Sequence, residues 1–252
     1  MGPGRSNWRR WVLGGIAVVL VGVVGGPFVY IHFFEGKAPA PLSLKTAGSP
    51  SPAASGATRA ATVSPAGGAA PAAGPGATSI DGTWRVAGGS QAGYRVKEVL
   101  FGQSNTAVGR TTSITGSLTV AGGNVTAGNL SADLTTVSSD QSRRDNQFQH
   151  RIMDTSSYPT AQFVLTQPIQ LGPAPADGAT VTRQVTGNLK LHGTTRSVTF
   201  PVSVMKTGST IDATGSVPIV FADYNIPNPS FGSVVTTDNH GTLEFLLNFT
   251  KS

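Results

Sequence analysis

The sequence contains no cysteine, and this absence excludes several kinds of chemistry. Disulfide bridges, thiolate metal sites, a cysteine nucleophile and a lipid-modified cysteine anchor are all ruled out. An oxidising compartment therefore poses no problem of thiol chemistry for the folding of this chain.

A strongly basic domain is also lacking, although the formal net charge of the chain is +6. Residues 1–34 carry +3, residues 35–79 carry +2 and residues 80–252 carry only +1. Nucleic-acid-binding domains concentrate basic residues on one face, whereas the C-terminal part of this chain is nearly neutral. Nucleic acid is therefore not an expected partner.

Recognisable catalytic motifs are missing as well. We find no nucleophile paired with a base, no paired carboxylates and no phosphate-binding loop. His150 and Asp154 stand four residues apart, but no second His or carboxylate accompanies them at the spacing of metal ligands. We therefore expect no enzyme activity, no cofactor and no metal site. Hydrolysis of a lipid-linked substrate through His192 or His150 is the least favoured alternative.

The first long apolar run, residues 11–34, has the length of a membrane span. It contains no Asp, Glu, Lys or Arg, and a helix of about 20 such residues crosses a hydrocarbon layer of ~30 Å. Arg5, Arg9 and Arg10 precede it, and positive residues beside a span tend to stay in the cytoplasm. We expect a single-pass signal-anchor, with residues 1–10 cytoplasmic and the rest of the chain extracytoplasmic.

A cleaved secretory signal is the alternative interpretation of this segment. Such signals have an apolar core of only ~7–15 residues before a small-residue cleavage site, and the run here is longer. Ala38-Pro39-Ala40 does imitate a cleavage site. The uncleaved anchor is favoured, and a secreted protein remains the alternative.

Small residues dominate the stretch that follows. From Gly36 to Ser79, 38 of 44 residues are Ala, Pro, Gly, Ser or Thr. This mixture has too little large apolar surface to offset the entropy of ordering it. Residues 35–79 are therefore predicted to be a disordered linker, which its prolines keep more extended than a Gly/Ser tether.

The remaining residues, 80–252, show the alternation that is typical of β-strands. From Val181 to Leu191, apolar odd positions alternate with polar even positions, except that Arg183 and Gly187 interrupt the apolar face. Each such strand has one apolar and one polar face, so we expect an all-β domain. The alternation recurs at residues 114–120, 198–204, 211–221 and 243–249.

Turn residues separate these runs at a spacing that favours antiparallel hairpins. The apolar parity changes from odd to even near Gly128-Asn129, which predicts a β-bulge at that point. The predicted turns lie at Gly122-Gly123-Asn124, His192-Gly193, Gly208 and Asn239-His240-Gly241.

One stretch, Ser139 to Met153, departs from the alternation. Phe148 and Ile152 lie four residues apart, Ser139 and its neighbours offer helix caps, and Tyr158-Pro159 follows the end of the stretch. We expect a short helix here that covers one end of a closed sheet.

Two motifs of this domain are specific enough to indicate a family. Residues 139–163 read SDQSRRDNQFQHRIMDTSSYPTAQF, with an Arg-Asp pair, an apolar-apolar-Asp triplet and Tyr-Pro-x-Ala-x-Phe in order. Residues 187–202 read GNLKLHGTTRSVTFPV, with the pattern Gly-x-Leu-x-Leu-His-Gly-x-Thr-Arg-x-Val. Both motifs resemble those of the YceI-like family, and a weaker likeness extends over nearly all of residues 80–252.

The resemblance implies a lipocalin-like antiparallel barrel of about eight strands that binds polyisoprenoid or similar lipids in its lumen. Three positions depart from the family pattern, because members often carry His where Gln147 stands, His near Glu98 and Arg where Phe221 stands. The departures concern a polar head-group site and leave the apolar pattern intact. The expected partners are an isoprenoid or similar lipid and the cytoplasmic membrane, with a homodimer left open.

The inward-facing apolar positions form the candidate wall of a lipid site. Side chains can either fill a barrel of this size or leave room for one slender ligand. Ordinary packed core is therefore the favoured interpretation of any one residue, and the set as a whole carries more weight than its members. Every methylene of a prenyl chain buried in such a lumen contributes ~0.8 kcal/mol. The candidate wall comprises Tyr94, Val96, Leu118, Leu134, Phe163, Leu165, Leu189, Leu191, Phe200, Ile219, Phe245 and Leu247.

Four basic residues are candidates for contact with a polar head group: Arg144, His150, His192 and Arg196. Structural roles are the favoured interpretation of two of them. Arg144 and Asp145 can form an ion pair that ties the helix to the barrel, and His192 suits a turn residue that is hydrogen-bonded to the backbone.

The anchor, the linker and the barrel pattern together indicate a module that carries or sequesters a lipid at the outer face of the cytoplasmic membrane. The alternative is a packed barrel that serves as a structural or protein-interaction module of the cell envelope. Such a module would expose an apolar patch or an edge strand instead of enclosing a lumen.

Overall fold

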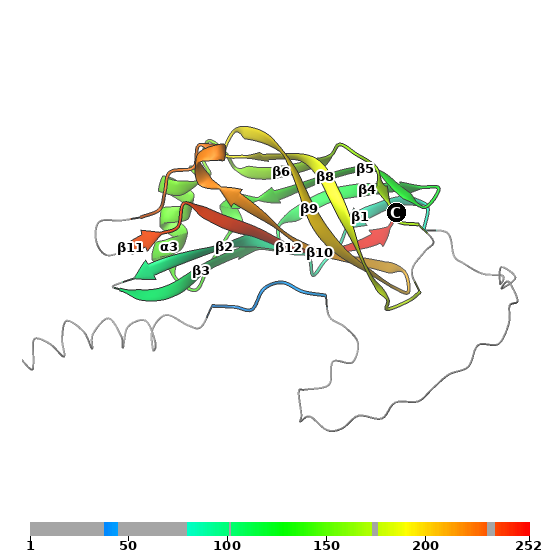
Figure 1. Cartoon of the computed structure of the whole chain (residues 1–252), viewed down its shortest axis with the longest axis horizontal. Coiled ribbons are helices and arrows are strands. Elements are labelled where there is room, and N and C mark those ends of the chain that lie inside the picture. The colour runs from blue at the N-terminus through cyan, green and yellow to red at the C-terminus, as the bar shows by residue number, and fades with distance from the viewer. Residues whose placement is uncertain (1–37, 45–79, 101, 173–175, 231–234) are drawn as a thin grey trace, which may run out of the picture.

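The computed structural model describes part of the chain, and the predicted membrane span at residues 11–34 lies outside that part. No helix within the described ranges is long and apolar enough to cross a membrane. The described residues are 38–44, 80–100, 102–172, 176–230 and 235–252 (Figure 1).

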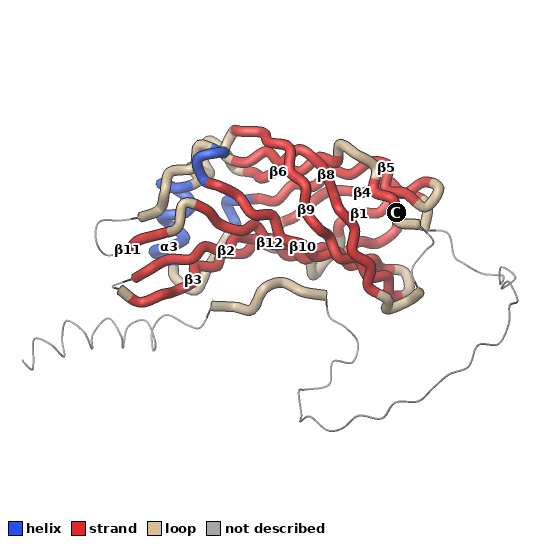
Figure 2. The backbone as a smooth tube through the Cα atoms, in the orientation of Figure 1, coloured by secondary structure: helices blue, strands red, loops and turns tan. Residues whose placement is uncertain are grey.

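Antiparallel strands make up most of residues 80–252, as Figure 2 shows in red. They follow the predicted alternation, and three of the four predicted turns join consecutive strands. The fourth prediction, Asn239-His240-Gly241, was wrong, because His240 and Gly241 already belong to the last strand. The strands are β1 Gly82–Val86, β2 Gln91–Leu100, β3 Gln103–Thr111, β4 Ile114–Ala121, β5 Asn124–Asp133, β6 Thr160–Leu165, β7 Ile169–Gln170, β8 Thr180–Leu191, β9 Thr194–Thr207, β10 Thr210–Val220, β11 Val235–Thr237 and β12 His240–Lys251.

The sheet closes on itself through β12. One edge of this strand pairs with β10, and its other edge pairs first with β2 and then with β1. The strands β1 and β2 therefore act as one long interrupted strand, and so do their partners β4 and β3. Counted in this way the barrel has eight long strands, in agreement with the prediction. The short β7 and β11 add to β5 and β2.

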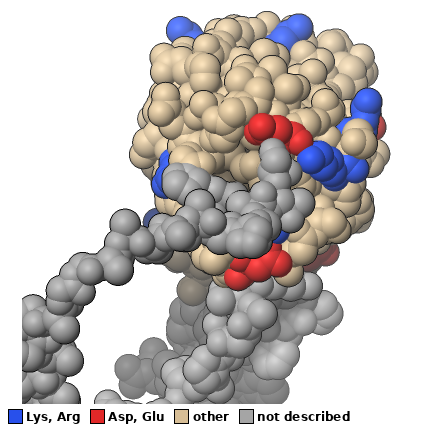
Figure 3. All heavy atoms as spheres, turned by 90° about the vertical axis from the view of Figure 1, so that its right-hand side faces the viewer, with Lys and Arg blue, Asp and Glu red and all other residues tan. Residues whose placement is uncertain are grey.

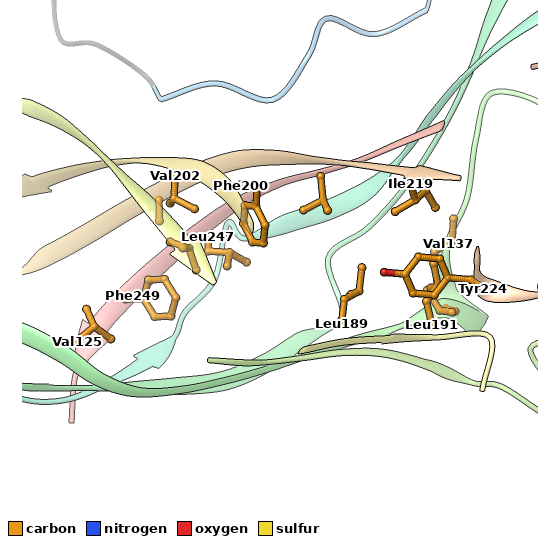
Figure 4. Close-up of a cluster of buried hydrophobic side chains, with 14 of the residues drawn as sticks. Val125, Val137, Leu189, Leu191, Phe200, Val202, Ile219, Tyr224, Leu247 and Phe249 are labelled. Carbon is orange, nitrogen blue, oxygen red and sulfur yellow. The ribbon is translucent and has the colours of Figure 1, made fainter. Parts of the chain in front are cut away.

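The alternation of apolar and polar residues places the core inside this barrel. On β8, Leu189 and Leu191 are buried, whereas the neighbouring Asn188 and Lys190 are exposed. The buried side chains form one cluster that runs the length of the interior. In Figure 4, Val125, Val202 and Phe249 lie towards one end of it, and Leu191 and Tyr224 lie towards the other.

A register shift between β4 and β5 confirms the predicted bulge but not its position. Thr119 pairs with Ala127 and Val120 pairs with Val125, so Thr126 is the extra residue. The predicted position at Gly128-Asn129 depended on counting Ala127, like Val125, among the inward-facing apolar residues. Ala127 is exposed, and a small side chain gave no reliable sign of the face on which it lies.

The predicted helix is present, although it is shorter and changes its winding. It consists of α3 Ser142–Gln147, which continues as the π-helical turn η4 Phe148–Ile152. Its N-cap is Gln141 and not one of the predicted polar residues; Ser139 instead donates through its backbone N–H and its hydroxyl to Asp145 Oδ1, at 2.8 and 2.6 Å. The helix lies at the end of the barrel shown on the left of Figure 1.

Three further pieces complete the described structure. Two are short 3-10 turns, η3 Leu134–Thr136 and η5 Phe221–Tyr224. The third is the extended segment Ala38–Leu44 from the predicted linker, drawn in blue in Figure 1 below β2, β12 and β10. Because it hydrogen-bonds to the barrel wall, it differs from the expected unattached linker.

An ion pair ties the helix to the barrel. Arg144 Nη2 lies 3.3 Å from Glu98 Oε1 on β2, and both side chains are about 85% buried, with exposed fractions of 15% and 13%. Arg144 also pairs with Asp140, one turn earlier. Arg144 therefore ties the helix to the barrel as predicted, but its partner on the barrel is Glu98, whereas the predicted partner was Asp145.

We expect Glu98→Gln and Arg144→Gln each to lower the free energy of unfolding by about 1–3 kcal/mol, because each leaves a largely buried charge without its partner. The double variant should lose clearly less than the two single losses combined. Denaturant unfolding of the full chain measures all three. Lys206→Gln, which breaks the more exposed pair with Asp177, is the control and should change little. Strictly additive losses would contradict the tie.

Candidate functional site: the barrel lumen

The barrel encloses a cavity of about 320 Å³. Its wall is almost entirely apolar and comes from the long strands and the helix together. Small-molecule sites in proteins span roughly 300–1,000 Å³ and are lined mainly by apolar side chains. The lumen therefore has the size and surface of a site for one slender apolar ligand.

Eleven of the twelve residues of the predicted wall line this cavity. The exception is Ile219, which is 7% exposed and belongs to the buried core without reaching the cavity. Those that do line it are Tyr94, Val96, Leu118, Leu134, Phe163, Leu165, Leu189, Leu191, Phe200, Phe245 and Leu247.

The helix and its C-cap residue contribute wall residues that were not predicted from the sequence. Phe148, Ile152 and Met153 all line the cavity. The Phe148 ring stacks on Tyr94 of β2, with ring centroids 5.0 Å apart and planes inclined by 13°. The i, i+4 spacing of Phe148 and Ile152 signalled an apolar helix face, but it did not show that this face lines the lumen.

Aromatic side chains from three strands meet inside the barrel. Phe200 lies edge-on to Phe163 at 5.5 Å and edge-on to Phe245 at 6.0 Å between ring centroids. The Phe245 ring fits because Gly215 faces it on β10: a Cβ there would lie 2.7 Å from Phe245 Cζ. The glycine thus gives the ring room to lie against the wall.

Polar groups gather at the helix end of the cavity. Glu98, Arg144 and Thr237 all line it there, and Asn105 donates a hydrogen bond of 3.0 Å to Glu98 Oε1. Thr237 is 8% exposed, and its hydroxyl has no hydrogen-bond partner among the described residues. Burial raises the pKa of the Tyr94 hydroxyl above its ordinary value, so this phenol is neutral at physiological pH.

Arg183 occupies the opposite region of the lumen. It is the residue that interrupted the apolar face of β8, and it lines the cavity. Its guanidinium donates to the carbonyl oxygens of Gln170, Thr182 and Leu171 at 2.9, 3.0 and 2.8 Å. The charge is thereby held by backbone carbonyls. The sequence marked Arg183 as unusual, because it breaks the alternation of apolar residues along β8.

The four candidates for head-group contact lie in different places. Arg144 lines the cavity, whereas His150 is exposed on η4 and does not line it. His192 Nδ1 lies 3.2 Å from the Tyr224 carbonyl oxygen, and Arg196 Nε donates to the Asp223 carbonyl oxygen at 2.9 Å. Both therefore bind the backbone of η5, and neither lines the lumen.

In the described parts of the chain, no three His, Asp or Glu residues lie close enough to hold a metal ion. Figure 3 shows few charged side chains on the visible surface at the end of the barrel away from the helix.

Comparisons with known proteins agree with this geometry. The family model described as YceI-like domain matches residues 84–249. A polyisoprenoid binding domain from Saccharophagus degradans, implicated in plant cell wall breakdown, is similar in structure with a TM-score of 0.55 and 16% identity, covering 67% of this chain and 98% of that one.

Two further solved structures are more distant. The Burkholderia cenocepacia protein BcnA gives a TM-score of 0.47 at 21% identity, covering 62% of this chain and 95% of its own. The Campylobacter jejuni YCEI protein gives 0.42 at 13%, covering 56% and 83%. A comparison with curated protein sequences gave no match. Since the family model spans most of the barrel, this chain belongs to the YceI-like domain family.

Proposed function

We propose that this protein binds a long apolar lipid of the isoprenoid type in the barrel lumen and carries or sequesters it at the outer face of the cytoplasmic membrane. The observation that carries the proposal is the cavity of about 320 Å³ with its almost wholly apolar wall. Each buried methylene contributes ~0.8 kcal/mol, so a prenyl chain can bind without polar contacts. The similar Saccharophagus degradans domain, described as polyisoprenoid binding, supports the class of ligand.

The two ends of the cavity favour one orientation of this lipid. The helix end offers the Thr237 hydroxyl, which has no hydrogen-bond partner among the described residues, beside the ion pair of Arg144 and Glu98. A free hydroxyl suits a head group that accepts a hydrogen bond. At the other end the donors of Arg183 are already engaged by backbone carbonyls. We infer that the head group lies near the helix and the tail points towards Arg183.

The packed interaction module receives less support from the surface. The exposed large apolar residues in the described ranges are Val99, Tyr158, Val164 and Val220. They lie on β2, on the loop before β6, on β6 and on β10. Because β2, β6 and β10 are not neighbours in the sheet order, the three valines do not form the joined apolar patch that such a module requires.

Organic extraction of the purified full chain, followed by mass spectrometry, should recover an isoprenoid in roughly stoichiometric amount. Ala161→Phe fills the lumen from β6 and should reduce the bound lipid about tenfold or more by displacing several methylenes. The matched control is Val164→Phe, which adds its ring on the outer face of the same strand, where the side chain is 50% exposed. Leu165→Trp repeats the test if the first variant does not fold. An extract without lipid, or equal loading of Ala161→Phe and Val164→Phe, would contradict the proposal.

The membrane anchor is tested by single-cysteine labelling, because the chain has no cysteine of its own. Ser209→Cys places a thiol in the exposed turn between β9 and β10. In intact cells an impermeant maleimide should label this variant, and the protein should sediment with membranes. Deletion of residues 1–34 should abolish both results. Labelling that requires cell lysis, or a mature chain that begins after Ala40, would contradict the anchor.

A further inference from the structure

The extended segment Ala38–Leu44, which we call the strap, lies against the outside of the barrel. In Figure 4 it is the pale blue segment at the top, on the opposite side of the wall from the lumen side chains. Ala38, Leu42 and Leu44 are partly buried, while the two prolines between them, Pro39 and Pro41, are exposed. The strap contacts strands that lie more than 50 residues later in the sequence.

A cluster of three charged residues on the outer wall, Glu244, Arg95 and Arg110, binds the strap. Glu244 of β12 is only 5% exposed although it faces outward. Arg110 Nη2 of β3 lies 2.8 Å from Glu244 Oε1, and Arg95 Nε of β2 lies 3.4 Å from Glu244 Oε2. Removing a carboxylate from water is costly unless it is paired and hydrogen-bonded. The two guanidinium groups supply that pairing.

Gly93 makes this cluster possible. It lies on β2 between Glu244 and Arg110 in the register of the sheet. A Cβ at Gly93 would lie 2.0 Å from the Gly109 carbonyl oxygen and 2.9 Å from Arg110 Cγ. With no side chain on the middle strand, the Arg110 side chain crosses over it and reaches Glu244.

The cluster binds the backbone of the strap through three hydrogen bonds. Arg95 Nη2 donates to the Pro39 carbonyl oxygen at 2.7 Å, and Arg110 Nη2 donates to the Ala40 carbonyl oxygen at 2.5 Å. The Leu42 N–H donates to Glu244 Oε2 at 3.4 Å. The Thr214 hydroxyl of β10 lies 3.2 Å from the Leu42 carbonyl oxygen, but its proton has a shorter bond of 2.8 Å to the Phe245 carbonyl oxygen.

The sequence of the strap suits this pattern of donors and acceptors. Proline has no N–H and favours an extended backbone, so Pro39 and Pro41 place no unpaired donor at the wall and hold the carbonyl groups available. Leu42 is the residue whose N–H meets the carboxylate. Recognition of an extended, proline-containing segment is a known mode of peptide binding. The outer wall therefore has the properties of a peptide site that this chain fills itself.

We propose that the strap sets the distance between the barrel and the membrane. The inference rests on the proposed anchor at residues 11–34. Only residues 35–37 separate that segment from the strap, so the Cα atoms of Phe34 and Ala38 lie at most about 14 Å apart in a fully extended chain. A free linker of residues 35–79 would instead have a root-mean-square span of roughly 35–40 Å.

The docked strap therefore keeps the wall formed by β2, β3 and β12 next to the bilayer. A lipid that leaves the membrane then has little water to cross before it reaches the barrel. A site filled by a segment of the same chain needs only modest intrinsic affinity, because the effective concentration of the segment is in the millimolar range.

Energy transfer tests the distance. The full chain with Ser209→Cys, labelled with a donor dye, is reconstituted in phosphatidylcholine vesicles that carry an acceptor on the lipid head group. Replacing residues 38–44 with seven Gly/Ser residues should lower the transfer about twofold or more. The control replaces residues 66–72 in the same way and should keep the original transfer. Neither variant alters the barrel sequence, so both should fold. Equal transfer in the strap variant and the control would overturn the proposal.

Hydrogen exchange tests the strap itself, independently of the anchor and of lipid loading. The Leu42 amide, whose N–H donates to Glu244 Oε2, should exchange at least about tenfold faster in Arg95→Gln than in the unaltered chain, because a donor to the strap is lost. Residues 45–79 should exchange equally in both proteins. An unprotected Leu42 amide in the unaltered chain would refute the docking. Protected amides with unchanged energy transfer would refute the membrane distance alone, and lipid content measured on the same samples reports separately on the proposed function.

Discussion

The closure of the sheet through β12 is the constraint on which the rest of this structure depends. One edge of β12 pairs with β10 and the other with β2 and β1, so no long strand edge on β12 is left for another chain. Closure also forces the inward side chains of all eight long strands to share one interior. Since these side chains are mostly apolar and do not fill that interior, a cavity of about 320 Å³ remains.

The sequence predicts this fold well because its signal is local. Alternation along each strand states which side chains face inward, and eleven of the twelve predicted wall residues do line the lumen. Ile219 is the exception, because inward orientation does not tell how far along the barrel the open space extends. The bulge was misplaced by a few residues because Ala127 is compatible with either face. The family resemblance supplied the barrel closure, which alternation alone does not contain.

Contacts between distant segments were harder to predict. Arg144 pairs with Glu98 and not only with residues of its own helix, and nothing near Arg144 in the sequence indicates that partner. His192 and Arg196 bind the carbonyl groups of η5, which follows them by about 30 residues. The docking of Ala38–Leu44 was the hardest contact to predict, because the composition of this segment matches a disordered linker and its hydrogen-bond partners lie far along the chain.

Arg183 has one more consequence for how the lumen can be used. Its guanidinium donates to three backbone carbonyl oxygens, which hold a charge where Arg183 lines the lumen. A hydrocarbon tail gains nothing by pressing against a charge. For the lipid that we propose, the depth from the helix to Arg183 would therefore limit the chain length: tails that fit would be wholly shielded, and longer ones would fold back or leave their excess in contact with water.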